Sequence, residues 1–184
     1  MRAQNFVFQM KEMNAYQVPF TGLKEGKHNF EFEVTNTFFL HFGYEEFNNA
    51  NIPVLLVLNK KATLMELTFT ATGTVSLNCD VTNEPFDQEI NTTLNLIVKF
   101  GDVFNDENEE ILILPHGEFQ VAVQQYIYEM IVLSIPVKRE HPGIADGTLK
   151  SEMFTKIKEY NGENKKEDHI DPRWNKLKNL LTDK

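Results

Sequence analysis

The sequence predicts an α+β protein: a twisted, mostly antiparallel β-sheet or partial barrel built on one long hairpin, with a covering helix and a C-terminal helical tail. From Met65 to Cys79 every odd-numbered residue is apolar or small, and the even-numbered residues between them are polar. Side chains alternate between the faces of a strand, so this run predicts a long strand with one buried face and one wet, threonine-rich face. A second alternating run, from Phe86 to Phe100, follows a turn that ends in Pro85.

Elements before the hairpin are shorter. Glu31 and Glu33 alternate with apolar neighbours, which predicts a strand over residues 29–34. The nearly continuous apolar run 52–58 predicts a strand covered on both faces. We also expect a strand over 5–9, a helical turn over 37–42, and a bulge or bend at Gly73, where a long strand must curve.

After the hairpin the pattern changes from strand to helix. Residues 101–110 are acidic and predict a loop, and residues 110–114 predict a strand. Between 118 and 134 apolar residues recur at steps of three and four, which predicts an amphipathic helix that Pro136 ends. This helix requires an apolar partner, and the inward face of the hairpin supplies it.

We expect residues 1–137 to form a single α+β domain and residues 138–184 a polar, partly flexible extension. The extension contains Pro142, Gly143 and Gly147 and few apolar residues. Asp171 is a suitable N-cap and Pro172 a suitable first-turn residue, so the extension is predicted to end in a short helix.

Charge is divided unevenly along the 184 residues, whose net charge is −9. Residues 1–137 carry 7 basic and 18 acidic side chains, a balance of −11, and residues 138–184 carry 11 and 9, a balance of +2. An acidic body disfavours nonspecific binding to phosphate backbones, which depends on Lys and Arg. A contact with nucleic acid is therefore expected in the extension, if anywhere.

The expected setting is the cytoplasm. No apolar run approaches the roughly 18–20 residues that a membrane span requires, and the first residues are polar. Cys79 is the single cysteine, so no intrachain disulfide forms. We expect no contact with a membrane.

No pattern of residues indicates an enzyme or a bound cofactor. The five histidines lack the spacing of a zinc site, and the acidic loop lacks the spacing and central glycine of a calcium loop. Cys79 lies on the apolar phase of its strand, where cysteine behaves as a small hydrophobe. No phosphate-binding or nucleophile-elbow motif occurs. We therefore expect no catalytic residues, no metal and no cofactor.

Residues 60–182 resemble the YceD family. The resemblance rests on the hairpin whose first strand ends in Cys79, on the apolar stretch that closes in Ile135-Pro136, and above all on the run Asp171-Pro172-Arg173-Trp174-Asn175-Lys176-Leu177-Lys178-Asn179-Leu180. One departure concerns the hairpin tip, where the family often has Cys-x-Arg-Cys-Leu. Here Val81 and Thr82 stand at the Arg and second Cys positions, so a metal or redox role of a cysteine pair does not transfer.

The resemblance implies a noncatalytic ribosome-biogenesis factor that supports accumulation of large-subunit ribosomal RNA. Its partner is expected to be ribosomal RNA or a basic ribosomal or assembly protein, with the oligomeric state undetermined. The alternative function is that of a small-ligand-binding, β-barrel-like protein with an aromatic interior. Candidate partner-binding residues are the basic and aromatic side chains of the extension: Arg173, Trp174, Lys176, Lys178, Lys138 and Arg139.

The C-terminal run has two interpretations. In a helix that begins at Asp171, Trp174 and Leu177 share one face. That face either docks on the body as a closing helix or anchors a partner, with Arg173 contacting phosphate or carboxylate.

Overall fold

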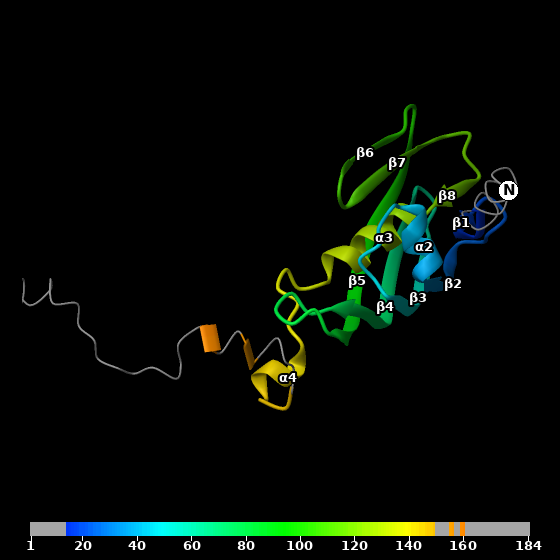
Figure 1. Ribbon diagram of the computed structural model, residues 1–184. Coiled ribbons are helices and arrows are strands. Elements are labelled where there is room, and N and C mark those ends of the chain that lie inside the picture. The colour runs from blue at the N-terminus through cyan, green and yellow to red at the C-terminus, as the bar shows by residue number, and fades with distance from the viewer. Residues whose placement is uncertain (1–13, 150–154, 157–158, 161–184) are drawn as a thin grey trace, which may run out of the picture. The chain divides into compact units, whose positions relative to one another are not determined.

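The computed structural model describes residues 14–149, 155–156 and 159–160. Contacts within the chain divide it into two compact units, Met1–His141 and Pro142–Lys184. The division lies a few residues beyond the boundary predicted from the sequence. In the second unit the structure describes the short helix α4 (Pro142–Ala145), and the first unit contains the sheet (Figure 1).

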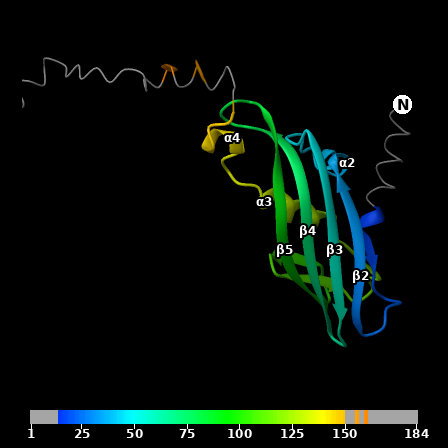
Figure 2. The same cartoon turned by 90° about the horizontal axis from the view of Figure 1, so that it is seen from below.

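The first unit is built on a six-stranded sheet in the order β2-β3-β4-β5-β7-β6. Its strands are β2 (Gly26–Thr35), β3 (Asn49–Lys60), β4 (Leu64–Asn78), β5 (Pro85–Gly101), β6 (Asn105–Asn108) and β7 (Ile111–Pro115). All pairs are antiparallel except β5 with β7. Figure 2 shows the four long strands β2 to β5 side by side. The predicted α+β class is confirmed, and the sheet is not closed into a barrel.

The long hairpin forms as predicted. Strands β4 and β5 pair from Leu64 opposite Lys99 to Asn78 opposite Pro85. The predicted bulge would shift the pairing of β4 with β3 at Gly73, but the register is the same on both sides of it. Ala71 lies opposite Val54, and Thr74 lies opposite Asn51. The glycine instead permits a close approach of the β3 backbone: a Cβ at Gly73 would lie 2.8 Å from Ile52 Cα.

Strand β3 is covered on one face only, which corrects the prediction for residues 52–58. Its even-numbered residues from 50 to 58 are buried, whereas Pro53 is exposed and Leu55 is 37% exposed. The apolar run therefore reflects a strand with one core face and several apolar residues on its outer face, since exposed apolar side chains are common on protein surfaces.

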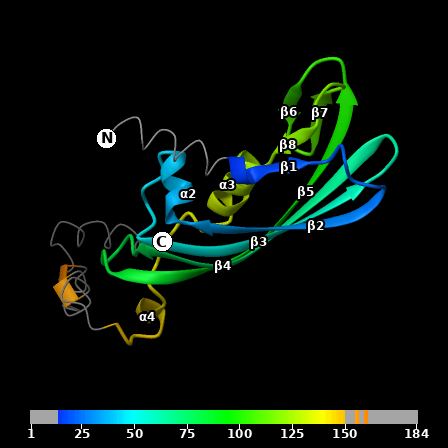
Figure 3. The ribbon, with the colours of Figure 1, turned by 90° about the vertical axis from the view of Figure 1, so that its right-hand side faces the viewer.

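The core face of the sheet is covered by helices and a small second sheet. Helix α2 (Asn36–His41), helix α3 (Gln124–Leu133) and the pair β1 (Gln17–Pro19) and β8 (Gln120–Ala122) lie on the same side (Figure 3). A single 3₁₀ turn, η1 (Asn14–Tyr16), precedes β1. The largest fully buried side chains come from both layers: Phe39, Phe69, Ile52, Leu56, Leu58, Met65, Leu67, Leu77, Ile90, Leu96, Ile127 and Ile131.

Helix α3 confirms the predicted covering helix but begins later than expected. Residues 118–123, predicted as its first turns, instead contain β8, which pairs with β1 from a distant part of the chain. Val18 and Val121 face each other in this pair and both are buried. The predicted loop 101–110 likewise contains β6, and the strand predicted over 110–114 is β7. The strand predicted over 5–9 and the helix begun at Asp171 lie outside the described residues.

Candidate functional site

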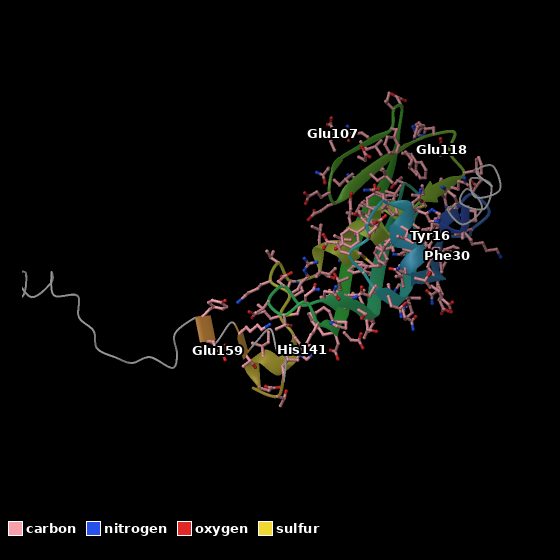
Figure 4. The ribbon with its side chains drawn as sticks, in the orientation of Figure 1. Tyr16, Phe30, Glu107, Glu118, His141 and Glu159 are labelled. Carbon is pink, nitrogen blue, oxygen red and sulfur yellow. The ribbon has the colours of Figure 1, made fainter. Side chains whose placement is uncertain are left out.

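The segment from Phe100 to Val137 contains no Lys or Arg and seven carboxylates: Asp102, Asp106, Glu107, Glu109, Glu110, Glu118 and Glu129. It comprises the end of β5, then β6, β7, β8 and α3. Figure 4 shows Glu107 and Glu118 at the same end of the first unit, where β6 and β7 lie. The fold therefore gathers negative charge beside α3.

A groove of about 560 Å³ runs between α3 and strands β7 and β8. Leu112, Leu114 and Val121 line it and are at most 5% exposed, so its floor is apolar and belongs to the core. Carboxylates of β6, of the turn after β7 and of α3 also line it: Asp106, Glu118 and Glu129.

A second groove of about 590 Å³ adjoins the first. Both grooves are lined by Asp106, Tyr126 and Glu129, so we treat them as one feature, the α3 groove. The second part adds Glu109 and Leu133, and Leu133 is 82% exposed. Among the described residues, no Lys, Arg or His lines either part.

The carboxylates affect the electrostatics inside the groove. The pKa of the Tyr126 phenol is raised, first by burial and then by the negative charges of Asp106 and Glu129. None of the ion pairs within the described part of the chain involves a carboxylate of the α3 groove. Glu129 Oε1 accepts a hydrogen bond from Gln125 Nε2 at 2.6 Å, but the Gln125 amide is neutral and does not cancel the charge of the carboxylate. Within the described residues, the groove therefore presents carboxylates without a basic partner above an apolar floor.

One polar atom of the groove is buried without a partner. Gln124, the first residue of α3, lines the first part, and its Oε1 makes no hydrogen bond. A buried acceptor without a donor is uncommon in folded proteins and is often satisfied by a water or ligand. Gln124 therefore places an unsatisfied acceptor in the buried part of the groove wall, not on its open surface.

The hairpin tip forms a second polar cluster. The Arg139 backbone N–H donates to Asp80 Oδ2 at 2.8 Å, and the Asp80 N–H donates to Arg139 O at 2.8 Å. The Arg139 guanidinium pairs with Asp80 and Glu46. These bonds lower the pKa of Asp80, with the backbone N–H of Arg139 as the largest cause. Arg139, a candidate partner-binding residue, is thus bound to carboxylates of its own unit.

Cys79 lies beside this cluster and is 2% exposed. Its Sγ accepts a hydrogen bond from the His141 N–H at 3.3 Å. Burial acts to raise the pKa of the Cys79 thiol, but hydrogen bonds from the Thr82 hydroxyl and from backbone N–H groups outweigh it, so the pKa is lowered. Thr82 is 3% exposed, so its hydroxyl lies beside the buried thiol and away from solvent.

The remaining candidate residues are less constrained or not described. Lys138 is largely exposed and pairs with Glu140 at 2.6 Å. Arg173, Trp174, Lys176 and Lys178 lie outside the described residues. The described residues contain no group of three or more His, Cys, Asp or Glu side chains placed to hold a metal ion.

Comparison with known families identifies the chain. The family model described as large ribosomal RNA subunit accumulation protein YceD matches residues 67–181, more than half of the sequence. The chain belongs to the YceD family. The match spans the hairpin tip, all residues that line the α3 groove except Gln17, and the C-terminal run of the YceD-family signature. No curated protein and no solved structure matches.

The YceD description suggests a role in accumulation of the ribosomal RNA of the large subunit. It describes an accumulation protein, not an enzyme. No helix in the described part of this YceD protein is long and apolar enough to cross a membrane.

Sequence reasoning missed the α3 groove. The signal that could have indicated it is the long interval from Phe100 to Val137 without Lys or Arg. That interval indicates negative charge but does not indicate a groove. Asp106 and Glu129 line one groove only because β6 and α3 pack beside β7.

Proposed function

We propose that this YceD protein is a noncatalytic ribosome-biogenesis factor of the cytoplasm that supports accumulation of large-subunit ribosomal RNA. It acts by binding ribosomal RNA or a ribosomal or assembly protein. The observation that carries the proposal is the family match over residues 67–181.

Two surfaces support a binding role. The α3 groove combines an apolar floor, the half-buried Tyr126 and Tyr128 of α3, and carboxylates without an ion pair among the described residues; these features suit the binding of a partner more than catalysis. Residues 138–184, the positively balanced part of the sequence, contain Arg173, Trp174, Lys176 and Lys178. We propose them as a recognition element, with Trp174 as anchor.

Lys138 and Arg139 differ in their proposed roles. Lys138 is 73% exposed at its side chain and stays a proposed partner contact. Arg139 is 28% exposed at its side chain and is held by Asp80 and Glu46, which supports a positioning role at the hairpin tip.

The alternative, a β-barrel-like protein that binds a small ligand in an aromatic interior, gains no support from the described structure. The sheet is open, and aromatic side chains of the layer that covers it contact one another, as Phe39 of α2 does with Phe47 at a ring distance of 4.7 Å. The α3 groove lies on the surface beside the covering helix, not inside the sheet.

Depletion of the protein tests the proposal. Cells that lack it should contain less large-subunit ribosomal RNA relative to small-subunit ribosomal RNA, and expression of the intact chain should restore the ratio. Quantification of both RNAs and sedimentation of the subunits provide the measurement. An unchanged ratio after complete depletion would contradict the proposed function.

A further inference from the structure

The α3 groove has the chemistry of a site for a positively charged peptide segment. It carries carboxylates on β6, on the turn after β7 and on α3, and no basic side chain from the described part of the chain lines it. Lys and Arg side chains of a partner would meet uncompensated charge there, whereas the phosphates of a nucleic acid would be repelled.

Apolar contact points accompany the charges. Phe104 lines the first part of the groove and is 52% exposed, and Leu133 lines the second part and is 82% exposed. Exposed aromatic and aliphatic side chains beside a pocket are typical of the anchors of protein interfaces. They indicate that the occupant carries an apolar residue as well as positive charge.

We propose that the α3 groove binds a Lys- and Arg-rich protein segment that carries an apolar anchor residue. The cellular role of this partner, a basic ribosomal or assembly protein, rests on the proposed function, but the binding itself does not. The occupant is protein because the carboxylates that attract Lys and Arg oppose the phosphate backbone of RNA.

Direct binding to the full-length protein tests the proposal. The probe is a short fluorescein-labelled peptide of Lys and Arg with one Phe, measured by fluorescence anisotropy. Comparison probes are the same peptide with Glu in place of every Lys and Arg, the same peptide with Ser in place of Phe, and a single-stranded RNA.

Charge dependence is measured with a double variant and a matched control. Asp106→Asn with Glu129→Gln removes two groove carboxylates, and Glu31→Gln with Glu89→Gln removes two exposed carboxylates from the outer face of the sheet. We expect the groove variant to bind the basic peptide at least about five-fold more weakly than the unaltered protein, since each exposed ion pair contributes modestly. The control variant should bind nearly as well as the unaltered protein.

The apolar contribution is measured in the same way. Phe104→Ser should weaken binding by about five-fold or more, as loss of an interface anchor does. Val103→Ser is the matched control, because Val103 is 74% exposed and does not line the groove. Replacing Phe in the peptide should reproduce the effect of Phe104→Ser.

Three results would overturn the proposal: equal binding by the groove and outer-face variants, binding of the acidic peptide as tight as that of the basic one, or RNA binding that depends on Asp106 and Glu129. These outcomes are separate from failure of the proposed function. Groove-dependent peptide binding with an unchanged ribosomal RNA ratio after depletion would reject the function and retain the site.

Discussion

Gly73 illustrates how one residue of β4 allows the sheet to pack. A Cβ at this position would meet the backbone of β3 at Asn51 O and at Ile52 Cα, and backbone atoms yield little. The neighbouring strands of the sheet hold β3 in place, so relief of the contact requires the two strands to separate.

We expect Gly73→Ala to lower the free energy of unfolding by about 1–3 kcal/mol, the usual cost of overpacking. Urea denaturation followed by circular dichroism provides the measurement. Gly117→Ala is the control, because a Cβ at Gly117 meets nothing within 4 Å and should leave stability nearly unchanged. Equal stability of the two variants would contradict the close approach of β3.

Asp80 makes the hairpin tip sensitive to acid. Its pKa in the folded protein lies below the ordinary value of 3.8, mainly because the Arg139 N–H donates to the carboxylate. A depressed folded pKa means that Asp80 contributes stability above its unfolded pKa and loses it as the pH falls through the folded pKa.

Asp80→Asn should therefore be less stable than the unaltered protein at neutral pH, and the difference should shrink below about pH 4. Urea midpoints measured from neutral to acidic pH test this. Asp87→Asn makes the same change of charge on an exposed residue of β5 and should not reproduce the pattern. A difference that persists unchanged at low pH would show that Asp80 does not act through its charge.

At the scale of the element, α3 has two different faces. Ile127, Met130 and Ile131 are buried against the sheet, while Tyr126 and Glu129 line the α3 groove. Tyr128 on the same helix stacks on Phe42, which follows α2, at a ring distance of 4.3 Å. The helix thus holds the covering layer together and also forms a wall of the proposed binding site.

Substitutions on the two faces of α3 should have different effects, one on stability and the other on peptide binding. Ile131→Ala should destabilise the protein by about 2–4 kcal/mol, because it leaves a cavity at a residue that is 0% exposed. Leu133→Ala, at the 82% exposed end of α3, should change stability by less than about 0.5 kcal/mol while weakening binding of the basic peptide. Chemical denaturation and peptide anisotropy provide the two measurements.

At the scale of the whole molecule, charge divides the sequence into two parts of different character. Residues 1–137 have a balance of −11 from 7 basic and 18 acidic residues, and residues 138–184 have +2 from 11 and 9. An acidic surface favours basic protein partners, whereas RNA contact is expected from Lys and Arg in the C-terminal part. The proposed groove and the proposed C-terminal recognition element are therefore suited to different contacts.

Trp174→Ala tests the C-terminal element in the intact protein. We expect the thermal unfolding midpoint to stay unchanged and the variant to restore less large-subunit ribosomal RNA in depleted cells. Asn179→Ala, in the same run, is the control and should restore it fully. A lowered midpoint would support a closing helix instead, and a stable, fully active variant would exclude both interpretations.

The hairpin was predictable because apolar and polar residues alternate along a strand with one buried face, and this period of two can be recognised from neighbouring residues alone. Alternation from Met65 to Cys79 suffices to place β4, whereas β8 has three residues, Gln120–Ala122, and no readable period. Its pairing with β1 depends on a contact between residues about a hundred positions apart, which converted the first predicted turns of α3 into a strand.

The sequence by itself determined the fold class, the hairpin, the uneven charge and, through its C-terminal run, the resemblance to the YceD family. Only the tertiary structure decided that Asp106 and Glu129 line one groove and that Arg139 is bound by Asp80 and Glu46. The physical reason is the distance along the sequence between the residues involved. Periodicity and charge are properties of neighbouring residues, but a site is a juxtaposition of distant ones, and packing of the whole chain sets which side chains meet.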